Sequence, residues 1–132
     1  MAIPPPTRRE RIHAAGAPAA IGPYSQGVLV GDTLYVSGQI ALDPQTGLLV
    51  ADDIQDETAR ALDNIEAVLH AADMDFAHVV QATVYLRVVA DYAPVNEVYA
   101  RYFSAAPPAR ETIEVGTLPR GARVQISCIA VR

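Results

Sequence analysis

The sequence predicts an α+β fold, a mixed six-stranded sheet with two helices on one face. Apolar residues recur with the helical period over 54–72 and 92–103, and six shorter segments alternate or run apolar as strands do. These segments follow one another as strand, hairpin, helix, strand, helix and two strands. Strand–helix–strand connections in this order place both helices on the same side of the sheet.

The strands are expected over residues 9–13, 26–30, 33–37, 79–88, 109–115 and 124–131. Only Gly31-Asp32 separates the second from the third, which favours a tight hairpin. The fourth is the clearest strand because its apolar residues alternate with polar ones. Alternation places one set on the buried face of the sheet: Val80, Ala82, Val84, Leu86 and Val88.

The two helices carry recognisable ends. Asp52 or Asp53 can cap the first helix, and Glu57 suits its first turn because a carboxylate there interacts favourably with the helix dipole. Asp91 is expected to cap the second helix, and Pro107-Pro108 ends it.

The chain is expected to form one domain over residues 8–132, without repeats, after a disordered arm over 1–7 that contains three consecutive prolines. With both helices on one face, the other face of the sheet is left bare. That face carries Tyr35, Thr83 and Tyr85, and a half-apolar uncovered sheet indicates an oligomer.

The composition excludes several functional classes. The net charge of −5 argues against a nucleic acid partner. All ten cationic residues are arginine, so chemistry that needs a lysine Schiff base or a P-loop lysine is excluded. The single cysteine, Cys128, and the spacing of the histidines predict no metal site. With no apolar signal core and no membrane span, a cytoplasmic location is expected.

Arg110 is the first candidate for a functional role. It starts an apolar strand directly after Pro107-Pro108, which places its guanidinium at a sheet end. A guanidinium can hold a carboxylate through two parallel N–H···O bonds. The alternative is a structural ion pair with Glu111 or Glu114, and the residues alone favour that alternative.

Four other residues could contribute to a small-molecule site. Tyr24 follows Gly22-Pro23 in a loop before a strand, and its ring and hydroxyl could line a pocket, or the ring simply packs for burial. Gly38 after Ser37 permits close backbone approach to a ligand, or it marks a bulge. Asn96 offers an amide from the second helix, or it faces solvent.

Several short blocks of the chain combine into a wider pattern. They are Ala17–Gly27, Tyr35–Ile40, Leu62–Ile65, Val95–Tyr99, Pro108–Arg110 and Ile129–Val131. In this order and at this spacing, from about residue 14 to the end, they resemble the Rid (reactive intermediate deaminase, YjgF-like) family.

That resemblance implies a chorismate-mutase-like fold and a homotrimer with clefts between subunits. It also implies hydrolysis of small 2-imino acids, or their enamine tautomers, to 2-oxo acids and ammonia without a cofactor. By position, Arg110 and the Gly38 backbone would hold the substrate carboxylate. Tyr24, Ser37 and Asn96 would line the cleft, and Thr112 would touch substrate and water through its backbone.

One position departs from the family pattern. Active members usually carry two glutamates in the last strand, where this chain has Val124-Gln125-Ile126-Ser127. Ser127 therefore stands where the family has the glutamate thought to deprotonate the attacking water. A serine hydroxyl can hold a water but is a poor base, and general-base help is worth about 10²–10⁴-fold. Glu114, on the same strand face as Arg110, is a possible substitute base.

Three functions follow as hypotheses. The first is an imine or enamine deaminase, slow or with an altered substrate. The second is a trimer that binds a small carboxylate without turnover, which suits Arg110 combined with Ser127. The third is a structural scaffold without a ligand, which the presence of both Arg110 and Gly38 disfavours.

Overall fold

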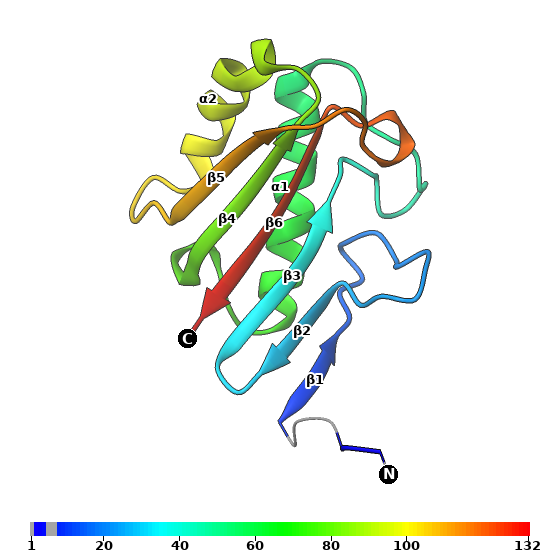
Figure 1. Ribbon diagram of the computed structural model, residues 1–132, viewed down its shortest axis with the longest axis vertical. Coiled ribbons are helices and arrows are strands. Elements are labelled where there is room, and N and C mark those ends of the chain that lie inside the picture. Colours follow the sequence, from blue (N-terminus) through cyan, green and yellow to red (C-terminus); the bar gives the residue numbers. More distant parts are fainter. Residues whose placement is uncertain (1, 5–7) are drawn as a thin grey trace.

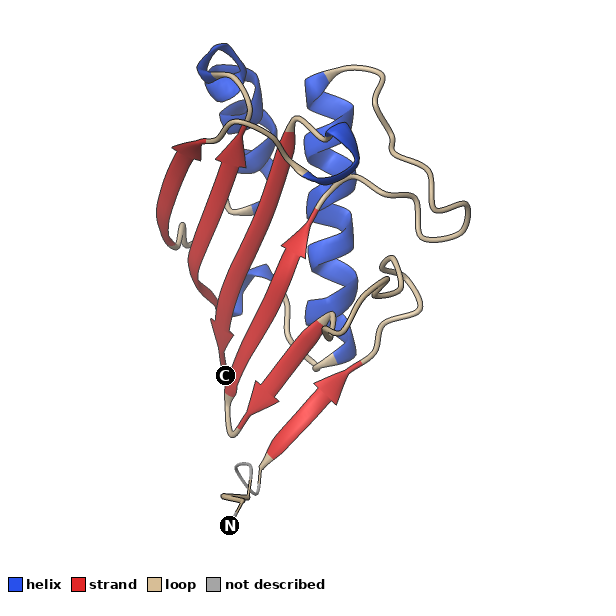
Figure 2. Cartoon of the chain, turned by 45° about the vertical axis from the view of Figure 1, so that its right-hand side comes forward, coloured by secondary structure: helices blue, strands red, loops and turns tan. Residues whose placement is uncertain are grey.

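The computed structural model describes residues 2–4 and 8–132 and confirms a six-stranded mixed sheet with two helices on one face (Figures 1 and 2). The strands are β1 (Arg9–Ile12), β2 (Gly27–Val30), β3 (Thr33–Gln39), β4 (Val79–Leu86), β5 (Ala109–Glu114) and β6 (Val124–Val131). The helices are α1 (Ile54–Ala71) and α2 (Tyr92–Tyr102). This is the α+β, chorismate-mutase-like fold that the sequence predicted.

The strand order is β1-β2-β3-β6-β4-β5, so the last strand of the chain lies in the middle of the sheet. Among the six described strands, only β4 and β5 pair in parallel, through the crossover that contains α2, and the other pairs are antiparallel. The predicted hairpin is present between β2 and β3, with Gly31 at a φ of 60° in its turn. That left-handed conformation is open to glycine without strain.

The core lies between the sheet and the two helices. Alternate residues of β6 are buried there, while those between them are half-buried or exposed on the opposite face, which neither α1 nor α2 covers (Figure 2). On that open face Tyr35 is 50% and Ile113 is 41% exposed. The expected bare, partly apolar sheet surface is thus present.

The alternation predicted for β4 fails at both of its ends. Val80 was expected to be buried but is exposed, because the ladder with β6 shifts register between Val79 and Gln81. The shift turns Val79 inward in its place, and a bulge of this kind cannot be read from alternation. Val88 is also exposed, because the strand ends at Leu86.

The cap of α1 agrees with the sequence, and that of α2 does not. Asp53 accepts a hydrogen bond from Asp56 N at 2.7 Å at the start of α1. Asp91 was expected to do the same for α2, but its side chain makes no capping bond. Its carboxylate instead binds the guanidinium of Arg123, a partner that lies 32 positions further along the chain.

Two buried polar side chains of α1 connect the helix to the sheet. One binds the backbone at the start of β6, and the other binds the loop that follows β3. Glu57 is 1% exposed and accepts hydrogen bonds from the backbone N–H groups of Arg123 at 2.6 Å and Val124 at 3.3 Å. Asn64 is fully buried and donates to the carbonyls of Ile40 and Leu42. The sequence indicated neither role.

The predicted disordered arm over 1–7 includes residues 1 and 5–7, which lie outside the described residues. The arm and the single-domain boundary stay predictions. Within the described residues, neither helix has the length and apolar character needed to cross a bilayer. Cys128 is buried in β6, as its apolar neighbours indicated.

Candidate functional site

Arg110 lies on the helix-covered face of the sheet, at the start of the edge strand β5. It pairs with Ala82, which pairs with Cys128, and both of these are buried beneath the helices. The guanidinium carbon lies 4.7 Å from the ring centroid of Tyr99 and 5.7 Å from that of Tyr92. Such cation–π contacts orient the charged group without neutralising it.

Arg110 forms no ion pair with a carboxylate of the described residues. The alternative interpretation, a structural pair with Glu111 or Glu114, therefore has no support in the geometry. Within the part of the chain that the structure describes, its one side-chain hydrogen bond runs from Nη2 to the hydroxyl oxygen of Tyr92 at 3.3 Å. Most of the guanidinium donors remain free for an anion.

A hollow of about 430 Å³ opens beside the guanidinium. It is lined by Asn96, Tyr99, Ala100, Phe103, Ser104, Pro107 and Arg110. The structure thus brings together Arg110 and Asn96, which the sequence proposed for one site. The volume falls within the range that small-molecule pockets occupy.

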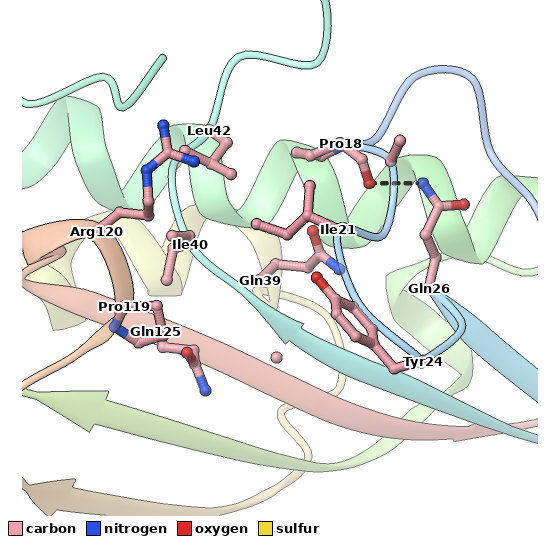
Figure 3. Close-up of a pocket in the computed structure, with 12 residues that line it drawn as sticks. Pro18, Ile21, Tyr24, Gln26, Gln39, Ile40, Leu42, Pro119, Arg120 and Gln125 are labelled. Atoms are coloured by element: carbon pink, nitrogen blue, oxygen red, sulfur yellow. Dashed lines mark hydrogen bonds between the residues drawn. The ribbon is translucent and has the colours of Figure 1, made fainter. Parts of the chain in front are cut away.

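Tyr24, Ser37 and Gly38 lie together, in a different part of the molecule. Tyr24 and Ser37 line an open hollow of about 530 Å³ near β1. Tyr24 and Gly38 also line a smaller cavity of about 100 Å³, where Tyr24 and Gln125 lie on either side (Figure 3). The hydroxyl of Ser37 is engaged, since it donates to the carbonyl of Ser25 at 2.6 Å.

The loop that presents Tyr24 is held by Gln26. The Gln26 amide oxygen accepts from Ala14 N at 2.7 Å, and its nitrogen donates to the Pro18 carbonyl at 2.8 Å (Figure 3). Gln26 is itself buried, so these bonds satisfy its amide and fix the path of the loop.

Gly38 lies at a bulge, because the ladder of β3 with β6 shifts register between Val36 and Gln39. A Cβ atom at this position would come within 2.5 Å of Gln125 Nε2. Gly38 thus shows both features that the sequence offered as alternatives, a bulge and a close approach to its backbone. The approaching group is the side chain of Gln125 in β6.

Ser127 and Thr112 lie on opposite faces of the sheet. Thr112 pairs with the buried Val84, so it shares the helix-covered face with Arg110. Ser127 lies between the buried Ile126 and Cys128 and so faces the open side. A single chain therefore does not bring Ser127 to the guanidinium of Arg110.

Glu114 lies at the far end of β5, about 13 Å along the strand from Arg110 at the usual rise per residue. Its carboxylate accepts a hydrogen bond from Val89 N at 3.0 Å. The substitute base that the sequence suggested thus has a backbone partner at another place.

Sequence reasoning missed Tyr92 and Tyr99 as functional-site residues. Both contact Arg110 from α2, and Asn96 lies between them. The spacing 92, 96 and 99 puts all three on one helical face, which is the signal that could have identified them.

The profile of the Endoribonuclease L-PSP family matches residues 14–132. The chain belongs to this family. It is 51% identical over 93% of its length to Protein DfrA of Myxococcus xanthus, of which 95% is covered. It is 50% identical over 94% of its length to a Bos taurus protein named 2-iminobutanoate/2-iminopropanoate deaminase, of which 90% is covered.

A solved structure supports the same assignment. The YjgF gene product of E. coli superimposes with a TM-score of 0.90 at 40% identity, covering 93% of this chain and 98% of that one. The resemblance to Rid, YjgF-like proteins that the sequence indicated is confirmed.

Proposed function

We propose that this protein hydrolyses a small 2-imino acid, or its enamine tautomer, to the 2-oxo acid and ammonia, in clefts between neighbouring copies of the chain. The observation that carries the proposal is Arg110, whose guanidinium lies beside an open hollow without a carboxylate partner among the described residues. The name of the Bos taurus relative supports the substrate class.

The proposed reaction asks little of the protein beyond orientation. Water adds through its oxygen to the imine carbon, the C–N bond breaks, and the nitrogen leaves as ammonia with the protons of the water. An imine is already electrophilic, so holding the carboxylate and one water in register supplies much of the rate enhancement. Arg110 would hold the carboxylate through its paired N–H groups.

An assembly between copies accounts for the two separated groups of site residues. Arg110, Thr112 and Asn96 would come from one copy, while Tyr24, Ser37, Gly38 and Ser127 would come from its neighbour. The exposed Tyr35 and Ile113 make the open sheet face a suitable contact surface. We propose a homotrimer that uses no cofactor and resides in the cytoplasm. Sedimentation of the purified protein tests the trimer, and a monomer would contradict it.

A second candidate function is binding of a small carboxylate without turnover. Ser127 favours it, because a hydroxyl holds a water but accepts no full proton near neutral pH without a partner base. The family description names an endoribonuclease. The net charge of −5 weighs against a nucleic acid substrate for this chain.

The deciding experiment measures 2-oxo acid release from freshly generated 2-iminopropanoate and 2-iminobutanoate. We expect the wild-type protein to accelerate release and Arg110→Ala to abolish the acceleration. Arg101→Ala serves as control, because Arg101 is an exposed arginine of α2 paired with Glu97. No acceleration by the wild type excludes the deaminase. Binding of 2-oxobutanoate without turnover, together with activity created by Ser127→Glu, would establish the second candidate.

A further inference from the structure

Two tyrosines of α2 hold the Arg110 guanidinium, and they differ in exposure. Tyr99 is 6% exposed and its ring lies beneath the charged group. Tyr92, the first residue of α2, is 43% exposed, and its hydroxyl oxygen lies 3.3 Å from Arg110 Nη2. Tyr99 lines the hollow beside Arg110, whereas Tyr92 lies outside that lining and contacts the same guanidinium from an exposed position.

The hydrogen bonds at Tyr92 leave its proton available. A guanidinium only donates, so the phenol oxygen accepts from Arg110. The polar side chain of Asn96, followed by the charge and hydrogen bond of Arg110, lowers the pKa of the phenol. The phenol oxygen is therefore the acceptor in its bond with Arg110, and its own proton can be donated to another group.

We propose that Tyr92 is a specificity-determining residue beside the Arg110 hollow, where it contacts the guanidinium. Its hydroxyl donates a hydrogen bond to the carboxylate of the bound acid, and its phenolate, once formed, displaces that carboxylate from the guanidinium. The inference rests on the proposed function, because it assumes that Arg110 receives the acid.

The chemistry selects a small organic carboxylate. The paired N–H groups of Arg110 match two carboxylate oxygens, and the Tyr92 hydroxyl adds a donor beside them. A neutral amide or ester gains nothing from the charge of the guanidinium. The hydroxyl therefore strengthens the preference for the anion over its uncharged analogues.

The same hydroxyl sets an upper pH limit on binding. Below its pKa the phenol is a neutral donor to the acid. Above that pKa the phenolate is a fixed anion that occupies the guanidinium and repels the carboxylate. Because the phenol pKa is lowered, this loss begins below the pH at which an ordinary tyrosine ionises.

Two other titratable side chains lie near Arg110 on the helix-covered face, those of Tyr99 and Cys128. Burial raises the pKa of Tyr99 to about 12 and that of Cys128 to about 12, so both stay neutral. Asp91, the preceding residue, is ion-paired with Arg123, and Asn96 carries no charge. A loss of affinity below pH 10 is then attributable to Tyr92.

The test is calorimetric titration of the full chain with 2-oxobutanoate, an unreactive stand-in for the imino acid, from about pH 7 to about pH 10. We expect Tyr92→Phe to weaken the neutral-pH Kd about 10-fold, as expected for loss of a hydrogen bond to a charged group. We also expect the affinity of the wild type for 2-oxobutanoate to fall as the pH rises towards the upper end of this range. Tyr92→Phe should show no such fall. A purely structural role for Tyr92 would leave the alkaline fall in place.

Tyr102→Phe is the matched control. Tyr102 lies on the same helix, but its hydroxyl donates to Asp63 at 2.9 Å, away from Arg110. We expect its Kd and its pH profile to follow the wild type. A Tyr92→Phe protein that binds as the wild type does at every pH overturns the inference.

Two further measurements separate this inference from the proposed function. If Arg110→Ala loses binding while Tyr92→Phe keeps it unchanged, the inference falls and the carboxylate site stands. If the wild type binds no small acid, both fall. Spectrophotometric titration of the wild type supplies a test without a variant. Bound 2-oxobutanoate must raise the pH at which one tyrosine ionises, by linkage, and a titration curve that the acid leaves unchanged overturns the inference.

Discussion

Both carboxylate oxygens of Asp91 accept hydrogen bonds from the guanidinium of Arg123, at N···O distances of 2.7 Å and 3.2 Å. Asp91 directly precedes α2, and Arg123 directly precedes β6. The pair therefore ties the end of α2 that carries Tyr92 to the start of the central strand. Asp91 is 5% exposed, so solvent screens this pair less than it screens a surface pair.

Asp91→Ala is expected to lower the free energy of unfolding by about 2 kcal/mol, because it leaves a half-buried guanidinium without its partner. Glu97→Ala removes the partner of Arg101 in an exposed pair at 3.4 Å, and it should change stability by less than about 0.5 kcal/mol. Urea denaturation of both variants measures the difference. Equal losses of unfolding free energy in the two variants would show that burial of Asp91 does not strengthen its ion pair with Arg123.

Glu57→Ala should destabilise the protein by about 3 kcal/mol, since it leaves the N–H groups of Arg123 and Val124 without an acceptor. Glu57→Gln keeps an acceptor oxygen, so it should lower the free energy of unfolding by less than Glu57→Ala does. The side chain of Glu66, on the same helix, makes no hydrogen bond within the described chain, and Glu66→Ala is the control for helix composition. Thermal unfolding ranks the three variants, and a Glu66→Ala loss as large as that of Glu57→Ala would contradict the prediction.

Gly27→Ala and Gly38→Ala should behave differently, although both glycines are closely approached. A Cβ at residue 27 meets Val68 at 2.9 Å and the Tyr35 carbonyl at 3.3 Å, and neither can move freely. We expect Gly27→Ala to lower the free energy of unfolding by about 2 kcal/mol.

At residue 38 the obstacle is the end of the Gln125 side chain, which can rotate away. Gly38→Ala should therefore change stability by less than about 1 kcal/mol, while weakening binding of 2-oxobutanoate. Thermal melts and calorimetry distinguish the two effects. A Gly38→Ala protein that melts earlier than Gly27→Ala would refute this assignment of the contacts.

Cys128 should resist thiol reagents in the native protein. Burial raises the pKa of its thiol to about 12, so the reactive thiolate is scarce near pH 8. Unfolding returns the thiol to its ordinary pKa, and labelling should then go to completion. Absorbance after addition of a disulfide reagent, with and without denaturant, measures this. Rapid labelling of the folded chain is the contrary result.

The sequence alone determined what depends on neighbouring residues. The period of α1, its cap at Asp53 and the hairpin at Gly31 follow from local geometry, and the structure agrees with each. The family resemblance was also readable, because its blocks keep their order and spacing along the chain. Arg110, Gly38 and Asn96 were candidates from their local sequence context, and the resemblance gave each of them a role.

Tertiary structure alone decided what depends on partners distant in the sequence. Asp91 pairs with Arg123 instead of capping a helix, and Glu57 is buried because two backbone donors of another segment reach it. Strand pairing put Arg110 and Ser127 on opposite faces of the sheet. Such contacts depend on which strands pair and in which register. Local propensity therefore identifies the residues that can form a site, and only the folded chain determines which of them meet.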